Sequence, residues 1–293
     1  MPYLVILLAS TTHFLESVML KKSNKKTPNG GFLFMGMISL FAMLFAVAMY
    51  VFTDAEKGDF TPEVIPYALI AGALYCASSF LTYIAVACGP FAITMLILSY
   101  SIVITCGYGI IFLNEPASIL TIIGFIIIAV SLFLVRGKDD EKKEGEEKPK
   151  ISFKWIICTA LSVVLSALYG IVIREQQIRF NDTVSRECMI ICLGFSALIL
   201  FVVGIVRSKK ESLTILKNCA PYAVAAGAAN GATNLLSIVL NTMMAISISS
   251  PTRSVVKTAI TFAYSYFILK EKFLPRQVVG IVLGVIATVL LNI

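Results

Sequence analysis

Charged side chains are scarce in this sequence. Asp, Glu, Lys and Arg make up 14% of its 293 residues, whereas 58% of the residues are hydrophobic. A soluble domain usually carries about a quarter charged residues. The composition therefore excludes an ordinary soluble domain and predicts a membrane protein with several spans.

The residues from which metal and catalytic sites are commonly built are also scarce. His13 is the only histidine, so no histidine pair is available for a metal site or for catalysis. The seven cysteines include no C-x-x-C pair, and their scatter gives neither a zinc site nor a disulfide framework. We therefore predict no metal, no cofactor and no enzymatic activity; a membrane-embedded acyl or phosphoryl transferase is the distant alternative.

Apolar runs long enough to cross a bilayer recur along the chain. A spanning helix needs about 20 predominantly apolar residues. We predict ten spans, at residues 2–20, 32–52, 66–87, 91–113, 117–135, 154–173, 188–206, 221–242, 247–269 and 276–293. The first run lacks a basic n-region and an A-x-A-like cleavage site, so we expect it to be a retained span rather than a signal peptide.

Lysine and arginine lie mainly in alternate connections between these runs. The odd-numbered connections and their flanks hold 18 of them, and the even-numbered ones hold 4. By the positive-inside rule, the odd connections face the cytoplasm and both termini face outward from the cell membrane. This distribution explains the net charge of +7, so the charge does not indicate a basic surface that binds nucleic acid. We expect the lipid bilayer and a small-molecule substrate as partners, with protons as a coupling ion.

The two halves of the chain are similar to each other. Tyr-Ala-Leu-Ile-Ala-Gly-Ala at 67–73 corresponds to Tyr-Ala-Val-Ala-Ala-Gly-Ala at 222–228, an offset of 155. A glutamate followed nine residues later by a glycine occurs at Glu115 and again at Glu271, an offset of 156. Because each copy holds five spans, the second enters the membrane in the opposite orientation, and the substrate site is expected between the halves. We predict an all-α membrane protein with ten transmembrane helices in a 5+5 inverted repeat, made of a first repeat 1–135, a charged linker 136–153 and a second repeat 154–293.

With these features the sequence resembles the drug/metabolite transporter superfamily, and specifically its ten-span EamA-type members. The resemblance rests on the duplication and on the glutamate and glycine pattern, and it covers essentially the whole chain. It implies a secondary transporter, often an exporter of metabolites or drugs, with a cavity lined by the first, third, fourth, sixth, eighth and ninth spans.

Two cations lie inside the predicted ninth span. Arg253 and Lys257 are four residues apart, so they share one helix face. Each costs about 2.5–3.5 kcal/mol at the centre of a membrane helix unless partners, water or substrate offset it. They either bind an anionic group of the substrate or form a structural pair with Glu16 or backbone carbonyls. The equivalent positions of the first repeat are Leu98 and Ile102, so this feature is asymmetric.

One acidic residue, Glu16, lies inside the first predicted span, close to His13. The run from His13 to Asn24 resembles the first helix of small multidrug resistance transporters, in which a membrane glutamate binds protons or a cationic substrate. That resemblance implies proton coupling through Glu16; a static counter-ion to Arg253 or Lys257 is the equal alternative. His13 either titrates near neutral pH or only forms a hydrogen bond.

Polar side chains form a stripe on the predicted eighth span. Asn230, Asn234 and Asn241 share a face there, and three amides on one stripe are more typical of a water-lined surface than of helix packing. Two of the equivalent positions in the third span are Tyr75 and Ser79. Further candidates for the lining are Tyr100 and Thr105 on the fourth span and Ser166 and Tyr169 on the sixth.

These observations predict a secondary active transporter of a small anionic or zwitterionic metabolite, such as an amino acid or an organic or phosphorylated acid. We expect it to work by alternating access, as an exporter, with protons as the coupling ion. The alternative is a proton-coupled exporter of cationic drugs, in which Glu16 binds the substrate and the basic pair is structural. A monomer and a homodimer are both compatible with the sequence.

Overall fold

The computed structural model describes residues 2–26, 30–52, 61–112, 119–135, 152–181, 183–243, 246–270 and 274–290. Within these ranges the regular structure is helical. The helices are α1 (Pro2–Lys26), α2 (Gly31–Phe52), α3 (Val64–Cys88), α4 (Phe91–Ser99), α5 (Ser101–Phe112), α6 (Ile119–Val135), α7 (Phe153–Arg179), α8 (Ser185–Ser208), η1 (Lys209–Glu211), α9 (Ser212–Met243), α10 (Ile246–Phe267) and α11 (Pro275–Leu290). The predicted linker 136–153 lies outside the described residues as far as residue 151.

Several of the helices are long and apolar enough to cross a membrane. Five meet both conditions among the described residues: Pro2–Asn24, Gly31–Phe52, Val64–Cys88, Phe153–Arg179 and Ser185–Ser208. Large apolar side chains are exposed along the outside of the bundle, as on α8 at Leu198, Val202 and Val206. Such an extended apolar surface suits lipid rather than water. The chain is therefore a multi-pass membrane protein.

The fourth predicted span is not one continuous helix. The sequence predicts a helix over 91–113, but α4 ends at Ser99 and α5 begins at Ser101, with Tyr100 between them. The Tyr100 N–H donates to the Ile97 carbonyl at 3.0 Å, which tightens the last turn of α4. An apolar run predicts which residues lie within the membrane, but it does not show whether the helix they form is continuous.

Other helices extend beyond the predicted spans, and α7 and α9 are clear examples. α7 continues to Arg179 rather than ending at residue 173, and α9 begins at Ser212 rather than at residue 221. Both extensions contain charged residues, among them Arg174 and Lys217. The hydropathy pattern therefore locates the edge of the apolar layer, whereas backbone hydrogen bonding continues the helix past it.

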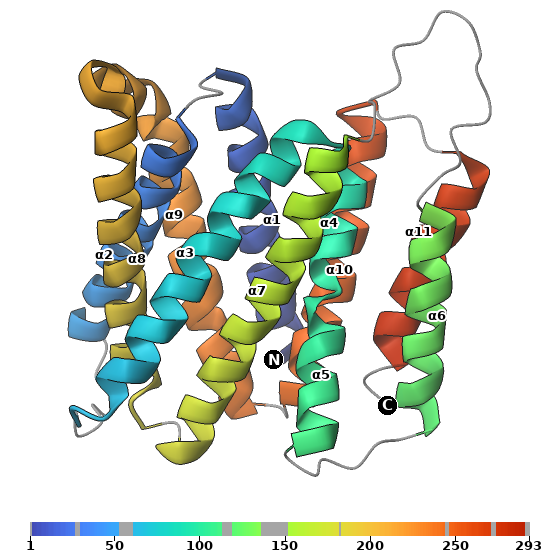
Figure 1. Ribbon diagram of the computed structural model, residues 1–293. Coiled ribbons are helices and arrows are strands. Elements are labelled where there is room, and N and C mark those ends of the chain that lie inside the picture. The colour runs from blue at the N-terminus through green and yellow to red at the C-terminus, as the bar shows by residue number, and fades with distance from the viewer. Residues whose placement is uncertain are drawn as a thin grey trace, which may run out of the picture.

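The helices stand side by side, and the two halves of the chain interleave (Figure 1). α1 packs against α9, and α3 packs against α7. α2 contacts both α8 and α9, and α6 pairs with α11 at one side of the bundle. Each of these pairs joins a helix of the first half to one of the second, so neither half folds as a separate bundle.

One end of the bundle is filled by apolar side chains. This closed end, opposite the start of α1 and the end of α11 in Figure 1, is packed by Leu20, Phe34, Tyr83 and Phe91. Lys21 Nζ lies 4.9 Å from the centroid of the Phe91 ring. The cation covers the aromatic cluster on the side from which α1 leaves the apolar layer.

Close helix contacts occur at Gly72 and Gly227, which belong to the repeated heptapeptide. A Cβ atom at Gly72 of α3 would lie 2.8 Å from the Cys192 carbonyl oxygen of α8. One at Gly227 of α9 would lie 2.9 Å from the Ile38 carbonyl oxygen of α2. Both neighbours are backbone atoms, which cannot turn aside as a side chain does, so these contacts require glycine.

We expect Gly72→Ala and Gly227→Ala each to lower the free energy of unfolding by about 1–3 kcal/mol, because the added methyl group pushes two helices apart. Thermal or denaturant unfolding in detergent measures this loss. Gly107→Ala is the matched control, since a Cβ at Gly107 meets nothing within 4 Å and alanine is the better helix former. Equal stability of all three variants would contradict the close contacts.

Candidate functional site

Met35 of α2 lines a cavity of about 540 Å³, and the rest of the lining comes from α1, α3, α4, α5, α7, α9 and α10. The latter helices occupy the predicted first, third, fourth, sixth, eighth and ninth spans. The cavity brings together most of the candidate residues from the sequence: His13, Glu16, Tyr75, Ser79, Thr105, Ser166, Tyr169, Asn230, Asn234, Arg253 and Lys257.

The two cations of α10 are held by neutral groups. Arg253 Nη1 donates to Ser237 Oγ of α9. Ser237 Oγ in turn donates to the Thr233 carbonyl at 2.6 Å, so its lone pairs are directed toward the guanidinium. Arg253 Nε is buried, and the described residues offer it no acceptor. The guanidinium therefore keeps one N–H donor without an acceptor in the described part of the chain.

Lys257 reaches across to α1. Its Nζ atom lies 3.1 Å from His13 Nε2. α1 also approaches α10 through Ser10, whose hydroxyl donates to the Arg253 carbonyl at 3.2 Å. The basic face of α10 is thus aligned with α1 by two polar contacts, one to a side chain and one to the backbone.

Glu16 is held by an amide rather than by a cation. Asn230 Nδ2 donates to Glu16 Oε1 at 3.0 Å, and Asn234 Nδ2 donates to Asn230 Oδ1 at 3.0 Å. In the described part of the chain no ion pair within 4.0 Å joins Glu16 to Arg253 or Lys257. The asparagine stripe of α9 therefore binds the carboxylate that the sequence analysis considered as a counter-ion to the basic pair.

The opposite wall is aromatic and hydroxylic. The rings of Tyr75 on α3 and Tyr169 on α7 lie 5.6 Å apart between centroids, at an interplanar angle of 52°. Thr82 and Ser162, one from each helix, are 2.7 Å apart between hydroxyl oxygens. This wall offers ring faces and hydroxyls to a solute held by the charged wall.

One candidate residue, Tyr100, is not brought to the cavity. Tyr100 is 4% exposed, and its hydroxyl lies 2.8 Å from Ser131 Oγ of α6, which donates to the Gly280 carbonyl of α11 at 2.6 Å. Because Tyr100 sits at the break between α4 and α5, its side chain packs toward the α6–α11 pair instead of lining the cavity. The side chain of Asn241 lies outside the described residues.

The sequence analysis missed Arg174 and Gln177, which line the cavity from the last two turns of α7. They were assigned to a connection because they follow the apolar run. The signal that could have found them is the run Ile173 to Arg179, which contains no glycine or proline and thus permits the helix to continue.

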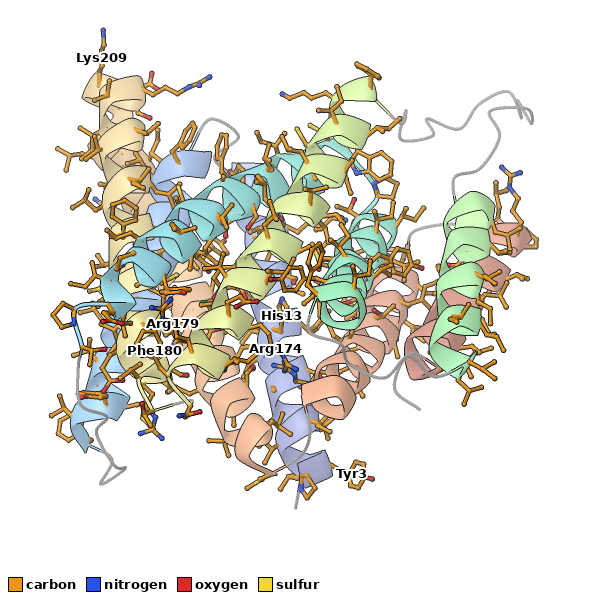
Figure 2. All side chains as sticks on the ribbon, turned by 60° about the horizontal axis from the view of Figure 1, so that its bottom comes forward. Tyr3, His13, Arg174, Arg179, Phe180 and Lys209 are labelled. Atoms are coloured by element: carbon orange, nitrogen blue, oxygen red, sulfur yellow. The ribbon has the colours of Figure 1, made fainter. Side chains whose placement is uncertain are left out.

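The cavity extends toward the end of the bundle that holds the chain termini. Arg174 and Gln177 line it there, whereas Leu20 and Met35 line it toward the closed end. In Figure 2, which turns the termini end forward, Arg174 and His13 are both visible between α7 and α1. The described charged residues of the lining are Glu16, Arg174, Arg253 and Lys257, so positive charge predominates.

Comparison with known proteins finds a family model that matches the first part of the chain and a solved structure that shares the fold of the whole. The model of the EamA-like transporter family matches residues 1–137, which confirms the predicted resemblance over that part of the chain. A crystal structure described only as "Crystal structure of protein" has a TM-score of 0.54 and 12% sequence identity, and the match covers 96% of this chain and 97% of that chain. At this identity the likeness shows a shared fold alone. The curated proteins give no match.

We expect Glu16→Gln and Asn230→Val to be non-additive, with a coupling free energy of about 1 kcal/mol, the range measured for hydrogen bonds between membrane helices. Unfolding of the two single variants and the double variant gives this value. The control cycle combines Glu16→Gln with Ser166→Ala, which lines the same cavity and should add within about 0.3–0.5 kcal/mol. Equal coupling in both cycles would contradict the specific contact between Glu16 and Asn230.

Proposed function

We propose, on the premise that residues 1–137 belong to the EamA-like transporter family, that this protein is a secondary transporter of a small anionic or zwitterionic organic metabolite. The solute crosses the cell membrane by alternating access, and the direction is export, as the resemblance implies. The observation that carries the substrate class is the cluster of cations with neutral partners in a cavity of about 540 Å³, a volume typical of small-ligand sites.

The charge of the cavity supports an anionic group on the solute. Arg253 donates to a serine hydroxyl and Lys257 contacts an imidazole, so neither charge is cancelled by a carboxylate within 4.0 Å among the described residues. Ionisable residues at membrane depth are retained mainly where they have a function. A guanidinium and an ammonium one turn apart together suit a carboxylate or a phosphate.

The ten-span, 5+5 inverted arrangement belongs to this proposal, with repeats at 1–135 and 154–293. In this arrangement α1 corresponds to α7, and α3 corresponds to α9. The contact between α1 and α9 therefore has a counterpart between α7 and α3, and both contacts occur. The close contact of Gly72 with α8 likewise has a counterpart in that of Gly227 with α2, and both contacts occur. This correspondence supports alternating access, because two inverted repeats can exchange their conformations about a fixed central site.

The orientation is part of the same proposal. Four lysines lie near the closed end: Lys21 near the end of α1, Lys154 in the first turn of α7, Lys209 in η1 and Lys217 near the start of α9. The positive-inside rule then supports a cytoplasmic closed end and outward-facing termini. In this orientation the cavity extends toward the outside, as in a conformation from which solute is released.

A cation exporter is the second candidate, and the observation that favours it is the presence of Glu16 in the cavity. Its carboxylate is bound by Asn230, and two basic residues of α10 line the same space. A cationic solute would therefore meet like charges on binding, which disfavours it. A transferase has less support, because the charged residues of the lining include one carboxylate and one histidine in no paired arrangement.

The test is thermal unfolding of the detergent-purified protein with sulfate, succinate, glutamate, a sugar phosphate and tetraethylammonium. An anion or zwitterion at 100 times its Kd should stabilise the protein by about 2.7 kcal/mol. Arg253→Gln/Lys257→Gln should fold and lose this stabilisation.

The matched control is Lys22→Gln/Lys217→Gln, which removes the same charge from exposed positions and should keep the stabilisation. Stabilisation by tetraethylammonium alone, lost in Glu16→Gln, would contradict the anionic substrate class and support the cation exporter. If anions still stabilise Arg253→Gln/Lys257→Gln, then Arg253 and Lys257 do not form the anion site.

A further inference from the structure

The contact between His13 and Lys257 determines how many protons the cavity can hold. Lys257 Nζ lies 3.1 Å from His13 Nε2. A charged ammonium has three N–H donors and no acceptor, and a protonated imidazole is a donor at both nitrogens. With Lys257 charged, the contact is therefore a hydrogen bond only when His13 is neutral, carries its proton on Nδ1 and accepts through Nε2.

A second proton on this pair would place two positive charges 3.1 Å apart. Such a pair repels strongly in a space from which water is partly excluded. The pair of His13 and Lys257 thus holds one positive charge when the cavity contains no anion.

The other helices around His13 do not relieve this repulsion. The charged or titratable side chains that share the cavity are Glu16 on α1, Tyr75 on α3, Tyr169 and Arg174 on α7, and Arg253 on α10. The facing residues of α9, Asn230, Thr233 and Asn234, are neutral, as are Ser99, Ser101 and Thr105 on α4 and α5. The one carboxylate among these described groups, Glu16, accepts a hydrogen bond from Asn230.

We infer that a solute anion and a proton bind in this cavity together, the anion at Arg253 and Lys257 and the proton at His13 Nε2. The inference rests on the proposed function and names its coupling site. An anion that draws the Lys257 ammonium toward itself frees Nε2, and its charge offsets that of an added proton. The N–H bond at Nε2 forms with a proton from water on the side from which the anion enters, and the proton returns to water when the anion leaves.

This arrangement assigns different roles to His13 and Glu16, the two titratable residues of α1 that line the cavity. His13 takes the transported proton, because its acceptor nitrogen is released when Lys257 moves to the anion. Glu16 orients Asn230 and Asn234 and does not exchange with the anion. A monovalent anion then crosses with one proton and carries no net charge.

The single histidine makes the first test direct, because the NMR spectrum of protein with ¹⁵N-labelled histidine contains one imidazole. We expect neutral His13 to be the Nδ1–H tautomer. Lys257→Gln should raise the proton affinity of His13 by about tenfold or more, since it removes an adjacent like charge. Lys22→Gln, at an exposed position near the closed end of α1, should leave it unchanged. A neutral Nε2–H tautomer, or equal titration in Lys257→Gln, would overturn the inference.

The second test adds the anion, with sodium sulfate compared with sodium chloride at equal ionic strength. Sulfate is chosen because it does not itself titrate between about pH 5.5 and 8. It should increase the protonated fraction of His13 in the wild type and not in Arg253→Gln. His13→Gln should still be stabilised by sulfate against heat, but its stabilisation should no longer depend on pH.

The outcomes separate this inference from the proposed function. Sulfate that stabilises the protein but leaves the His13 titration unchanged would overturn coupling at His13 and leave the anion site intact. If the loss of pH dependence follows Glu16→Gln instead of His13→Gln, the proton site is Glu16 and the inference is wrong. If sulfate has neither effect, both coupling and the anion site are contradicted.

Discussion

The constraint on which the site depends is the presence of two cations in an apolar, membrane-embedded helix. A charge at that depth must be solvated by polar groups, and α10 cannot supply them all from its own backbone. α1 and α9 do so: Ser237 and His13 contact Arg253 and Lys257, and Ser10 binds the α10 backbone. The need to solvate these cations thus accounts for the polar faces of two helices that are otherwise apolar.

The scaffold around these groups is symmetric, whereas the chemistry inside it is not. Gly72 and Gly227 make corresponding close contacts in the two halves of the chain. Yet the position that corresponds to Arg253 in the first half is Leu98, which lines the same cavity. A duplicated scaffold gives two equivalent conformations, and the asymmetric lining allows the solute to be held by one wall.

Much of this arrangement could be predicted from the sequence, because bilayer energetics leave few alternatives. Intramembrane charges and an amide stripe predicted His13, Glu16, Asn230, Arg253 and Lys257, and all of them line one cavity. Each residue is conspicuous in an apolar run and needs no tertiary information to be noticed.

The sequence analysis failed where local backbone geometry or pairing decides the outcome. Tyr100 turns away because the helix breaks at its position, and no glycine or proline marks that break. Arg174 follows the apolar run 154–173, so hydropathy alone places it outside the predicted span although α7 continues to Arg179. The partners of Glu16 and Lys257 could not be predicted for another reason. Spacing along one helix shows which residues share a face, but it does not determine which side chains of a neighbouring helix they contact.

Neutral partners have a consequence that an internal salt bridge would lack. A carboxylate within 4 Å of Arg253 would compete with any solute anion for the same donors, and it would be present at a fixed, high effective concentration. A serine hydroxyl and an imidazole are neutral, and they contact Arg253 and Lys257. Because their interaction with a cation is weaker than that of a carboxylate, a solute anion can replace them more easily. The cations then stay bound in the empty cavity yet remain attractive to an anion. Glu16, the carboxylate of the described lining, accepts a hydrogen bond from the Asn230 amide and makes no ion pair within 4.0 Å with either cation.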